Sequence, residues 1–423
     1  MHVSAHRAFG LLRELGFERV SGSAQERAVA QRLLEEVQGA GAAAHLEEFS
    51  VPCGRVKHAR LKVTEPYEKE YEVTGYQRAR STPAEGLDGA FYYAENVLPA
   101  HLQQAAGKIV LINGRLRRKD YEALQKAGVA AILTFSGSTL DRRSETDCDI
   151  RKLRETLTEP FGDAVAVNLR AADAAEMVRR GAKTLHLELE GESYDGVSQN
   201  VCAEIPGTDR PQEIISFGAH YDSVYFSSGV YDNLSGSVIL LELLRYFAAH
   251  PPRRTLKFNW FGSEEQGLLG SKAWTAAHAD ELDKHLLMIN LDVAGATLGQ
   301  NSAPVLATPA ATAYVDGLMR EMGTACLVKS DIYSSDCIPF ADHGVPAVNL
   351  CRFGAPGANY IHDRRDSLKS GYLDEHALDI TLQQALFLAC RVVNAEVFPI
   401  AREISDEIRQ KVDEYLFRKE PKD

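Results

Sequence analysis

The sequence predicts an α/β protein built on a mostly parallel mixed sheet with helices on both faces, plus a smaller inserted β-rich α/β domain. From Val197 onward, short apolar runs typical of buried strands alternate with longer segments of helical periodicity. Between residues 52 and 190, short strand patterns dominate instead. We therefore expect a main domain formed by 1–51 and 191–423, and an inserted domain formed by 52–190.

The first 51 residues begin the main domain with two helices and a strand. Amphipathic patterns predict helices at 4–16 and 24–41. Ser23 is a natural N-cap for the second helix, and Glu26, three residues later, completes a capping box. Alternating residues at 43–51 then predict a strand.

The inserted stretch consists mainly of short strands. Its strand patterns lie at 60–64, 70–74, 107–112 and 129–134. A helical pattern at 119–127 joins the last two of them, and the polar segment 136–161 indicates a long surface loop. The stretch contains no cluster of His, Asp or Glu at metal-ligand spacing, which indicates an added module rather than the place of chemistry.

The remaining chain carries the alternating pattern of the main sheet. Its predicted elements are strand 198–205, strand 213–219, helix 234–249, strand 255–261, helix 266–278, strand 286–292, helix 309–322, strand 345–350 and helix 374–397. This order favours crossover connections and a largely parallel sheet. A last charged helix at 401–418 is either an oligomer contact or, more simply, a solvated face.

Composition and charge exclude several classes of partner. The chain has 423 residues, 45% hydrophobic and 25% charged, with a formal net charge of −12 and no basic stripe. A nucleic-acid partner is therefore not expected. No run reaches the roughly 20 apolar residues of a membrane helix, so no membrane partner is expected either. A homo-oligomer stays open.

Cysteine usage and the N-terminus indicate a cytoplasmic protein. The seven cysteines are odd in number and none lies in a CxxC pair, which favours a reduced compartment. Residues 1–7 lack the apolar core of a signal peptide.

Two adjacent carboxylates, Glu264 and Glu265, directly follow the predicted strand that ends at Phe261. Ligands of open α/β sheets bind at the carboxyl ends of the strands. Consecutive side chains point in different directions, so one glutamate can bind a metal while the other moves a proton. A solvated acidic helix start is the alternative, because it also suits the helix dipole.

Other ligand-type side chains decide in favour of a metal site. They lie at successive strand ends and in loops: His220, Asp232, Asp292 and His362. Two further carboxylates could support the histidines, Asp222 beside His220 and Asp366 four residues after His362. Each alone has an ordinary structural explanation, such as a helix N-cap for Asp232. Together, mixed His and carboxylate ligands suit Zn²⁺, with Mn²⁺ or Co²⁺ as alternatives. Five ligands with one bridging carboxylate suit two metal ions about 3.5–4 Å apart.

These motifs resemble those of the co-catalytic dinuclear zinc exopeptidases, the bacterial zinc aminopeptidase and glutamate carboxypeptidase type. The shared motifs, in chain order, are His220-Tyr221-Asp222, Asp232-Asn233-Leu234-Ser235-Gly236, Glu264 to Ser271, Asn290-Leu291-Asp292, and His362 with Asp366. The segment 52–190 resembles the protease-associated domain often inserted in these enzymes, through 107–110 and 127–132.

The resemblance implies a phosphorylase/hydrolase-like zinc exopeptidase fold and two Zn²⁺ ions, with Mn²⁺ or Co²⁺ as alternatives. Asp232 would bridge both metals. Glu265 and His362 would complete one site, and His220 and Asp292 the other.

The resemblance also implies the chemistry: a zinc-dependent metallopeptidase, most simply an aminopeptidase that hydrolyses N-terminal residues of short peptides through a metal-bridging water. Glu264 would be the general base and Asp222 would orient His220. The family's cis peptide is expected between Tyr231 and Asp232.

Three alternatives stay open: a carboxypeptidase or dipeptidase on the same two-metal site, a glutaminyl cyclase-like enzyme, and a non-catalytic receptor-like homologue. A free substrate carboxylate requires Arg or Lys nearby. Arg352, Arg364 and Arg365 could supply it, or could be surface ion-pair residues. Cys337 stands where relatives often have His, which leaves specificity open.

Overall fold

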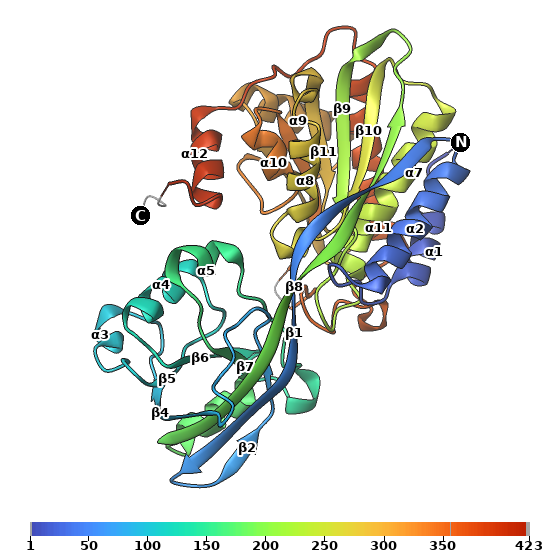
Figure 1. Ribbon diagram of the computed structural model, residues 1–423. Coiled ribbons are helices and arrows are strands. Elements are labelled where there is room, and N and C mark those ends of the chain that lie inside the picture. The colour runs from blue at the N-terminus through green and yellow to red at the C-terminus, as the bar shows by residue number, and fades with distance from the viewer. Residues whose placement is uncertain (1, 356, 420–423) are drawn as a thin grey trace. The chain divides into compact units, whose positions relative to one another are not determined.

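The computed structural model describes residues 2–355 and 357–419 (Figure 1). The chain forms two compact units, one from residues 1–51 and 197–423, and one from 52–196. It passes between them within two long strands, β1 (Ala43–Glu65) and β8 (Thr184–Ile205). The assignment of the second unit as a protease-associated domain stays a prediction.

The larger unit contains a mixed, mostly parallel sheet with strand order β13-β12-β14-β11-β9-β10-β8. Its further strands are β9 (Arg210–His220), β10 (Arg254–Phe261), β11 (His285–Leu291), β12 (Gly299–Leu306), β13 (Leu327–Ser330) and β14 (Ala347–Gly354). β9 pairs in parallel with both β10 and β11, and β11 with β14, whereas β8 and β12 run antiparallel to their neighbours β10 and β14. The predicted mostly parallel mixed sheet is confirmed.

Helices cover both faces of this sheet, as predicted. They are α1 (Ala5–Leu15), α2 (Ala24–Gly39), α7 (Ser235–Ala249), α8 (Leu269–Ala277), α9 (Pro309–Met322), α10 (Cys337–Asp342), α11 (Glu375–Val393) and α12 (Asp406–Tyr415). One buried apolar cluster joins α1, α2, α7, α9 and α11 to the sheet, and a second joins α8, α10 and α12. Figure 1 shows α1 and α2 beside α7.

Local sequence explains where several helices begin. Ser4, Ser23, Thr308, Asp374 and Ser405 each accept a backbone N–H of the first turn through their side-chain oxygen. The predicted N-cap at Ser23 is therefore confirmed. The predicted capping box is wrong. The Glu26 carboxylate, which should accept the N–H of Ser23, turns away into the interior and accepts the N–H of Ser263 instead.

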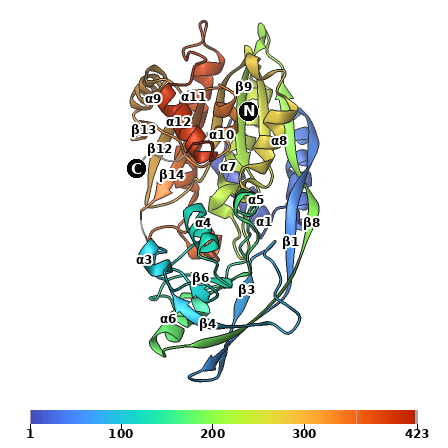
Figure 2. The same cartoon turned by 60° about the vertical axis from the view of Figure 1, so that its left-hand side comes forward.

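The C-terminal helix α12 is not simply a solvated face. Its side chains Ile408 and Val412 are buried in the same apolar cluster as Ile338 and Phe340 of α10. Figure 2 shows α12 beside α10. The sequence 401–418 contains many charged residues and few buried apolar ones. Its periodicity therefore did not indicate a buried face.

Several elements escape the sequence patterns, among them two strands of the larger unit and one helix of the smaller unit. β12 carries Asn301, Ser302 and Pro304 in place of an apolar alternation, and β13 has only four residues. The long loop expected at 136–161 is wrong at its end, where helix α5 (Glu155–Phe161) includes Pro160. Proline inside a helix is unfavourable, and so it masks the pattern.

The smaller unit is a sheet with helices packed on it, in strand order β8-β4-β5-β6-β7-β3, and β1 pairs with β2 and β8. Its strands are β2 (Lys69–Tyr71), β3 (Val73–Gly75), β4 (Leu87–Tyr93), β5 (Ile109–Leu111), β6 (Ala131–Ser136) and β7 (Ala166–Arg170). Its other helices are α3 (Pro99–Leu102), α4 (Arg118–Lys126) and α6 (Ala171–Arg179). A short helical turn lies at Arg143–Glu145 in this unit, and the larger unit has further ones at Leu282–Lys284 and Leu368–Ser370.

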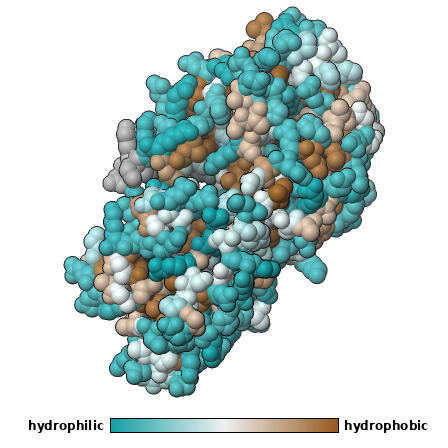
Figure 3. All heavy atoms as spheres, viewed as in Figure 1, coloured by the Kyte–Doolittle hydropathy of each residue, from teal (hydrophilic) through white to brown (hydrophobic). Residues whose placement is uncertain are grey.

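The surface shown in Figure 3 is mainly hydrophilic, in agreement with the charged composition of the chain. The face in Figure 3 is largely hydrophilic, with hydrophobic residues in small separate patches. Within the described ranges, no helix is long and apolar enough to cross a membrane.

Candidate metal centre

The structure brings the five predicted metal ligands together in the larger unit. They come from strand ends and the segments that follow them: His220 from the end of β9, Asp232 from the turn η2 (Val230–Leu234), Glu265 from the turn η3 (Glu264–Gln266), Asp292 directly after β11, and His362 from the segment between β14 and α11. Because β9, β10 and β11 are parallel, their carboxyl ends meet at one edge of the sheet.

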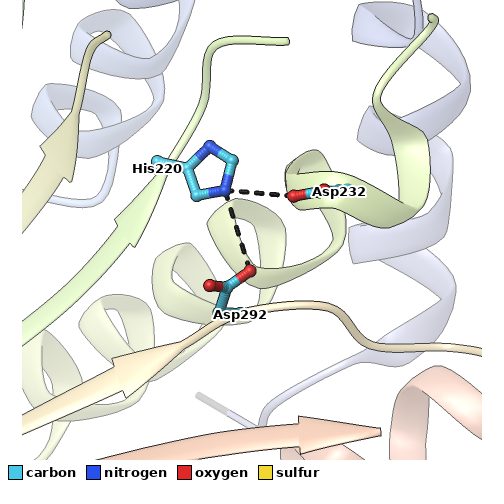
Figure 4. A group of neighbouring side chains, drawn as sticks. All are labelled: His220, Asp232 and Asp292. Carbon is cyan, nitrogen blue, oxygen red and sulfur yellow. Dashed lines mark ion pairs between the residues drawn. The ribbon is translucent and has the colours of Figure 1, made fainter. Parts of the chain in front are cut away.

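The first group of metal-type side chains is His220, Asp232 and Asp292 (Figure 4). The Nε2 atom of His220 lies 3.2 Å from Asp232 Oδ1 and 3.7 Å from Asp292 Oδ1. All three residues are buried. In Figure 4 the two carboxylates point toward the same ring nitrogen.

The second group is Asp232, Glu265 and His362. Here the Nε2 atom of His362 lies 3.1 Å from both Asp232 Oδ2 and Glu265 Oε2. Asp232 thus presents one oxygen to each group, which is the arrangement of a bridging carboxylate.

Charge and burial show that this donor set fits metal cations. Burial raises the pKa of both Asp292 and Glu265. Burial alone would lower the pKa of His220, but the charge of Glu264 and further carboxylates raise it well above its ordinary value. Buried like charges are costly unless cations compensate them. One imidazole and two carboxylates in each group suit zinc, and together the groups fit two zinc ions.

Glu264 lies beside the first group without belonging to either group. Its Oε2 atom is 3.8 Å from His220 Nε2. Burial is the main cause that raises its pKa well above the ordinary value. A carboxylate with a raised pKa next to a metal-type group is suited to proton transfer.

Asp222 holds two parts of the site at once. Its Oδ1 atom lies 3.3 Å from His220 Nδ1 and also accepts the backbone N–H of Glu264 at 3.0 Å. The Oδ2 atom accepts the N–H of Glu265 at 3.2 Å. Asp222 is therefore placed to orient the imidazole and also fixes the backbone of both glutamates.

Asp366 supports Asp232, not His362. Its two carboxylate oxygens accept the backbone N–H groups of Tyr231 at 2.9 Å and of Asp232 at 3.1 Å. Burial raises the pKa of Asp366 to about 7.

The expected cis peptide between Tyr231 and Asp232 is wrong, since the cis bond follows Asp232 and joins it to Asn233. The Asn233 side chain fixes this turn. It donates to Leu291 O at 2.8 Å and accepts the N–H of Val293 at 3.0 Å.

Two residues of the segment before α10, Tyr333 and Asp336, were not identified from the sequence as part of the site's surroundings. Burial, and then the charges of Asp292 and Asp232, raise the pKa of Tyr333 and keep its hydroxyl protonated. Asp336 is fully buried and accepts a hydrogen bond from Ser271 Oγ at 2.6 Å. The motif Tyr-x-x-Asp between a strand and an apolar helix was the available signal.

Cys337, Arg352 and Arg365, which were considered for substrate specificity, are engaged in contacts within the protein. Cys337 is fully buried in the apolar cluster of α10. Arg352 donates to Ala296 O at 2.7 Å and to Asn301 Oδ1 at 2.8 Å. Arg365 forms an ion pair with Asp363.

The open mixed sheet, the two groups that share Asp232 and the adjoining Glu264 define a two-metal hydrolase. Comparison with known proteins gives the family. Residues 200–388 match the model described as Peptidase family M28, and the fold and ligand set of the chain fit the co-catalytic zinc exopeptidases. It is thus a zinc metallopeptidase.

Individual relatives agree with this family. Aminopeptidase YwaD of Bacillus subtilis (strain 168) is 25% identical over 399 residues, which cover 90% of this chain and 82% of the relative. Carboxypeptidase Q of Mus musculus is 25% identical over 306 residues, which cover 68% of this chain and 64% of the relative. The solved structure of a zinc aminopeptidase from Bacillus subtilis shares the fold, with a TM-score of 0.78, 21% identity, and coverage of 96% of this chain and 99% of that one.

Proposed function

We propose that this protein is an aminopeptidase that removes N-terminal residues from short peptides. The observation that carries the proposal is the placement of Asp232, with one oxygen toward His220 and the other toward His362, beside the buried Glu264. Similarity to aminopeptidase YwaD over 90% of the chain supports it.

In this proposal, His220, Asp232 and Asp292 hold one zinc ion, and Asp232, Glu265 and His362 hold the other. When bound, such ions polarise the scissile carbonyl and acidify water.

The protein's own residues then move protons and stabilise charge. Glu264 accepts the proton of the attacking water and delivers it to the leaving amine, for which its raised pKa suits it. The protonated hydroxyl of Tyr333 can donate to the oxyanion that develops on the carbonyl oxygen. Asp222 keeps the backbone of Glu264 in place throughout.

A carboxypeptidase is the second candidate, supported by the similarity to carboxypeptidase Q. That activity requires a cation for the free substrate carboxylate. The guanidinium groups of Arg352 and Arg365 are engaged by carbonyl groups and by Asp363, which favours the aminopeptidase.

We also propose a reducing, cytoplasmic setting. All seven cysteines are free thiols, and four of them are buried. Peptides are the expected partners of a peptidase, and the net charge of −12 supports the absence of a nucleic-acid partner.

The test compares aminoacyl anilides and free dipeptides with their N-acetylated forms, with added Zn²⁺, Mn²⁺ or Co²⁺. Glu264→Gln should lower kcat roughly 10²–10⁴-fold while both metals still bind. Glu281→Gln, a carboxylate that pairs with Lys257 on the same unit, is the matched control and should keep full activity. Hydrolysis confined to N-acetylated peptides with a free C-terminus would replace the aminopeptidase by the carboxypeptidase.

A further inference from the structure

Glu26, in the first turn of α2, is a buried carboxylate with no pairing cation among residues 2–355 and 357–419. Its Oε1 atom accepts hydrogen bonds from Ser198 Oγ at 2.8 Å and from the backbone N–H of Ser263 at 3.1 Å. Its Oε2 atom accepts the N–H of Gly22 at 2.6 Å. The carboxylate therefore connects the start of a helix to a turn 237 residues further along the chain.

That turn carries the two glutamates of the metal centre. Ser263 adopts a left-handed conformation with φ of 56°, which is unfavourable for a residue with a side chain. Three successive N–H groups are each held by a buried carboxylate: Ser263 by Glu26, and Glu264 and Glu265 by Asp222. The Ser263 hydroxyl also lies 3.3 Å from Glu26 Oε1.

A helix cap does not account for this arrangement. Ser23 already caps α2, and Glu26 makes no bond to the N–H of Ser23, which instead donates to Val20 O. Burying a carboxylate without a cation costs free energy, and this cost is offset only by the donors that surround it. Two of these donors belong to Ser263, so the carboxylate is matched to the turn.

We propose that Glu26 is a positioning residue of the metal centre. By holding Ser263 in its left-handed conformation, Glu26 directs the Glu265 carboxylate toward His362 and the Glu264 carboxylate toward the other group. The effect on peptide hydrolysis rests on the proposed function, whereas the effect on metal binding does not.

The experiment measures Co²⁺ binding by visible absorption and Zn²⁺ binding by calorimetry, together with kcat and KM on an aminoacyl anilide. Glu26→Ala removes every contact, and Glu26→Gln keeps the volume and one acceptor oxygen. The matched control is Glu242→Gln in α7, a fully buried glutamate that pairs with Arg7 and Arg245 away from the metal centre.

We expect the Glu26 variants to weaken binding of one of the two metals about 10–100-fold and to lower kcat by a similar factor, with KM changed less than about threefold. Glu26→Gln should retain more of both properties than Glu26→Ala. Glu242→Gln should lower the melting temperature and leave metal affinity and kcat unchanged.

Unchanged metal affinity and kcat in every Glu26 variant that folds would overturn the proposal, and Glu26→Gln keeps this test available if Glu26→Ala does not fold. Equal losses in the Glu242 control would overturn it as well, because they would show a general effect of instability. If the wild type binds two metals but hydrolyses no peptide, the proposed function fails, and the metal titration still decides the role of Glu26.

Discussion

Replacing Arg19 by methionine removes a buried cation on which the loops around the metal centre depend. The side chain of Arg19 is fully buried and donates to the backbone carbonyls of Tyr221 at 2.7 Å, Ser228 at 2.6 Å and Gly229 at 2.9 Å. Burial lowers the pKa of Arg19 to about 10, and the charge of Asp366 opposes this shift. The guanidinium therefore stays protonated at neutral pH.

The magnitude follows from the groups left behind. Methionine fills a similar volume but donates nothing. The carbonyls of Tyr221, Ser228 and Phe17, to which Arg19 also donates, lose their donor, whereas Gly229 O still accepts the N–H of Leu234. A buried polar group without a partner costs about 1–3 kcal/mol, which gives roughly 3–9 kcal/mol for three. Two effects offset part of this sum: the methionine side chain is favourably buried, and a charge no longer has to be buried. We therefore expect a net loss of about 3–5 kcal/mol in the free energy of unfolding.

Urea unfolding followed by tryptophan fluorescence measures this loss. Both tryptophans, Trp260 and Trp274, are buried in the larger unit, so the signal reports the unit that contains Arg19. Arg253→Met, which removes a surface ion pair with Asp209, is the control and should hardly move the midpoint. A loss below about 1 kcal/mol for Arg19→Met would refute the reasoning, because a single unsatisfied carbonyl would already exceed it.

Two further predictions concern catalysis and pH. Tyr333→Phe should lower kcat by up to about 10²-fold with little change in KM, measured on an aminoacyl anilide, and an unchanged kcat would contradict a role in oxyanion stabilisation. Burial lowers the pKa of His285 to about 3, below the value of about 6.5 expected in the unfolded chain. The unfolded chain thus binds the proton more readily, so stability is lost as the pH falls below 6.5. Below about pH 6, the wild type should lose about 1.4 kcal/mol per pH unit more than His285→Gln, and parallel urea midpoints for the two proteins would contradict this.

The ligands of the metal centre are the part of the site that local sequence signals identify. His220, Glu265 and Asp292 each stand at or just beyond the end of an apolar strand, and the strands are parallel in the structure. Parallel strands place their carboxyl ends at one edge of the sheet, so the predicted parallel arrangement already indicates that such side chains meet.

Three of the residues that support these ligands carried no signal of their actual partners. Glu26 has the sequence position of a capping-box residue, yet its carboxylate bonds to Ser263. Arg19 lies in a short connection between two helices, and three of its five carbonyl partners are more than 200 residues away in the chain. Asp366 stands four residues after His362, which suggested that it supports that ring, whereas it holds the backbone of Asp232.

The sequence by itself determined the fold class, the order of most elements along the main domain and the identity of the side chains with metal-binding chemistry. These properties depend on periodicity and residue type, which are local and can be recognised within a few residues. The tertiary structure places one oxygen of Asp232 toward each group, as the family resemblance implied. Only the tertiary structure decided that the cis peptide follows Asp232 and that Glu26, Arg19 and Asp366 hold the surrounding loops. The physical reason is that a buried polar side chain bonds to whatever donors and acceptors the folded chain brings within reach, and chain separation does not limit that reach.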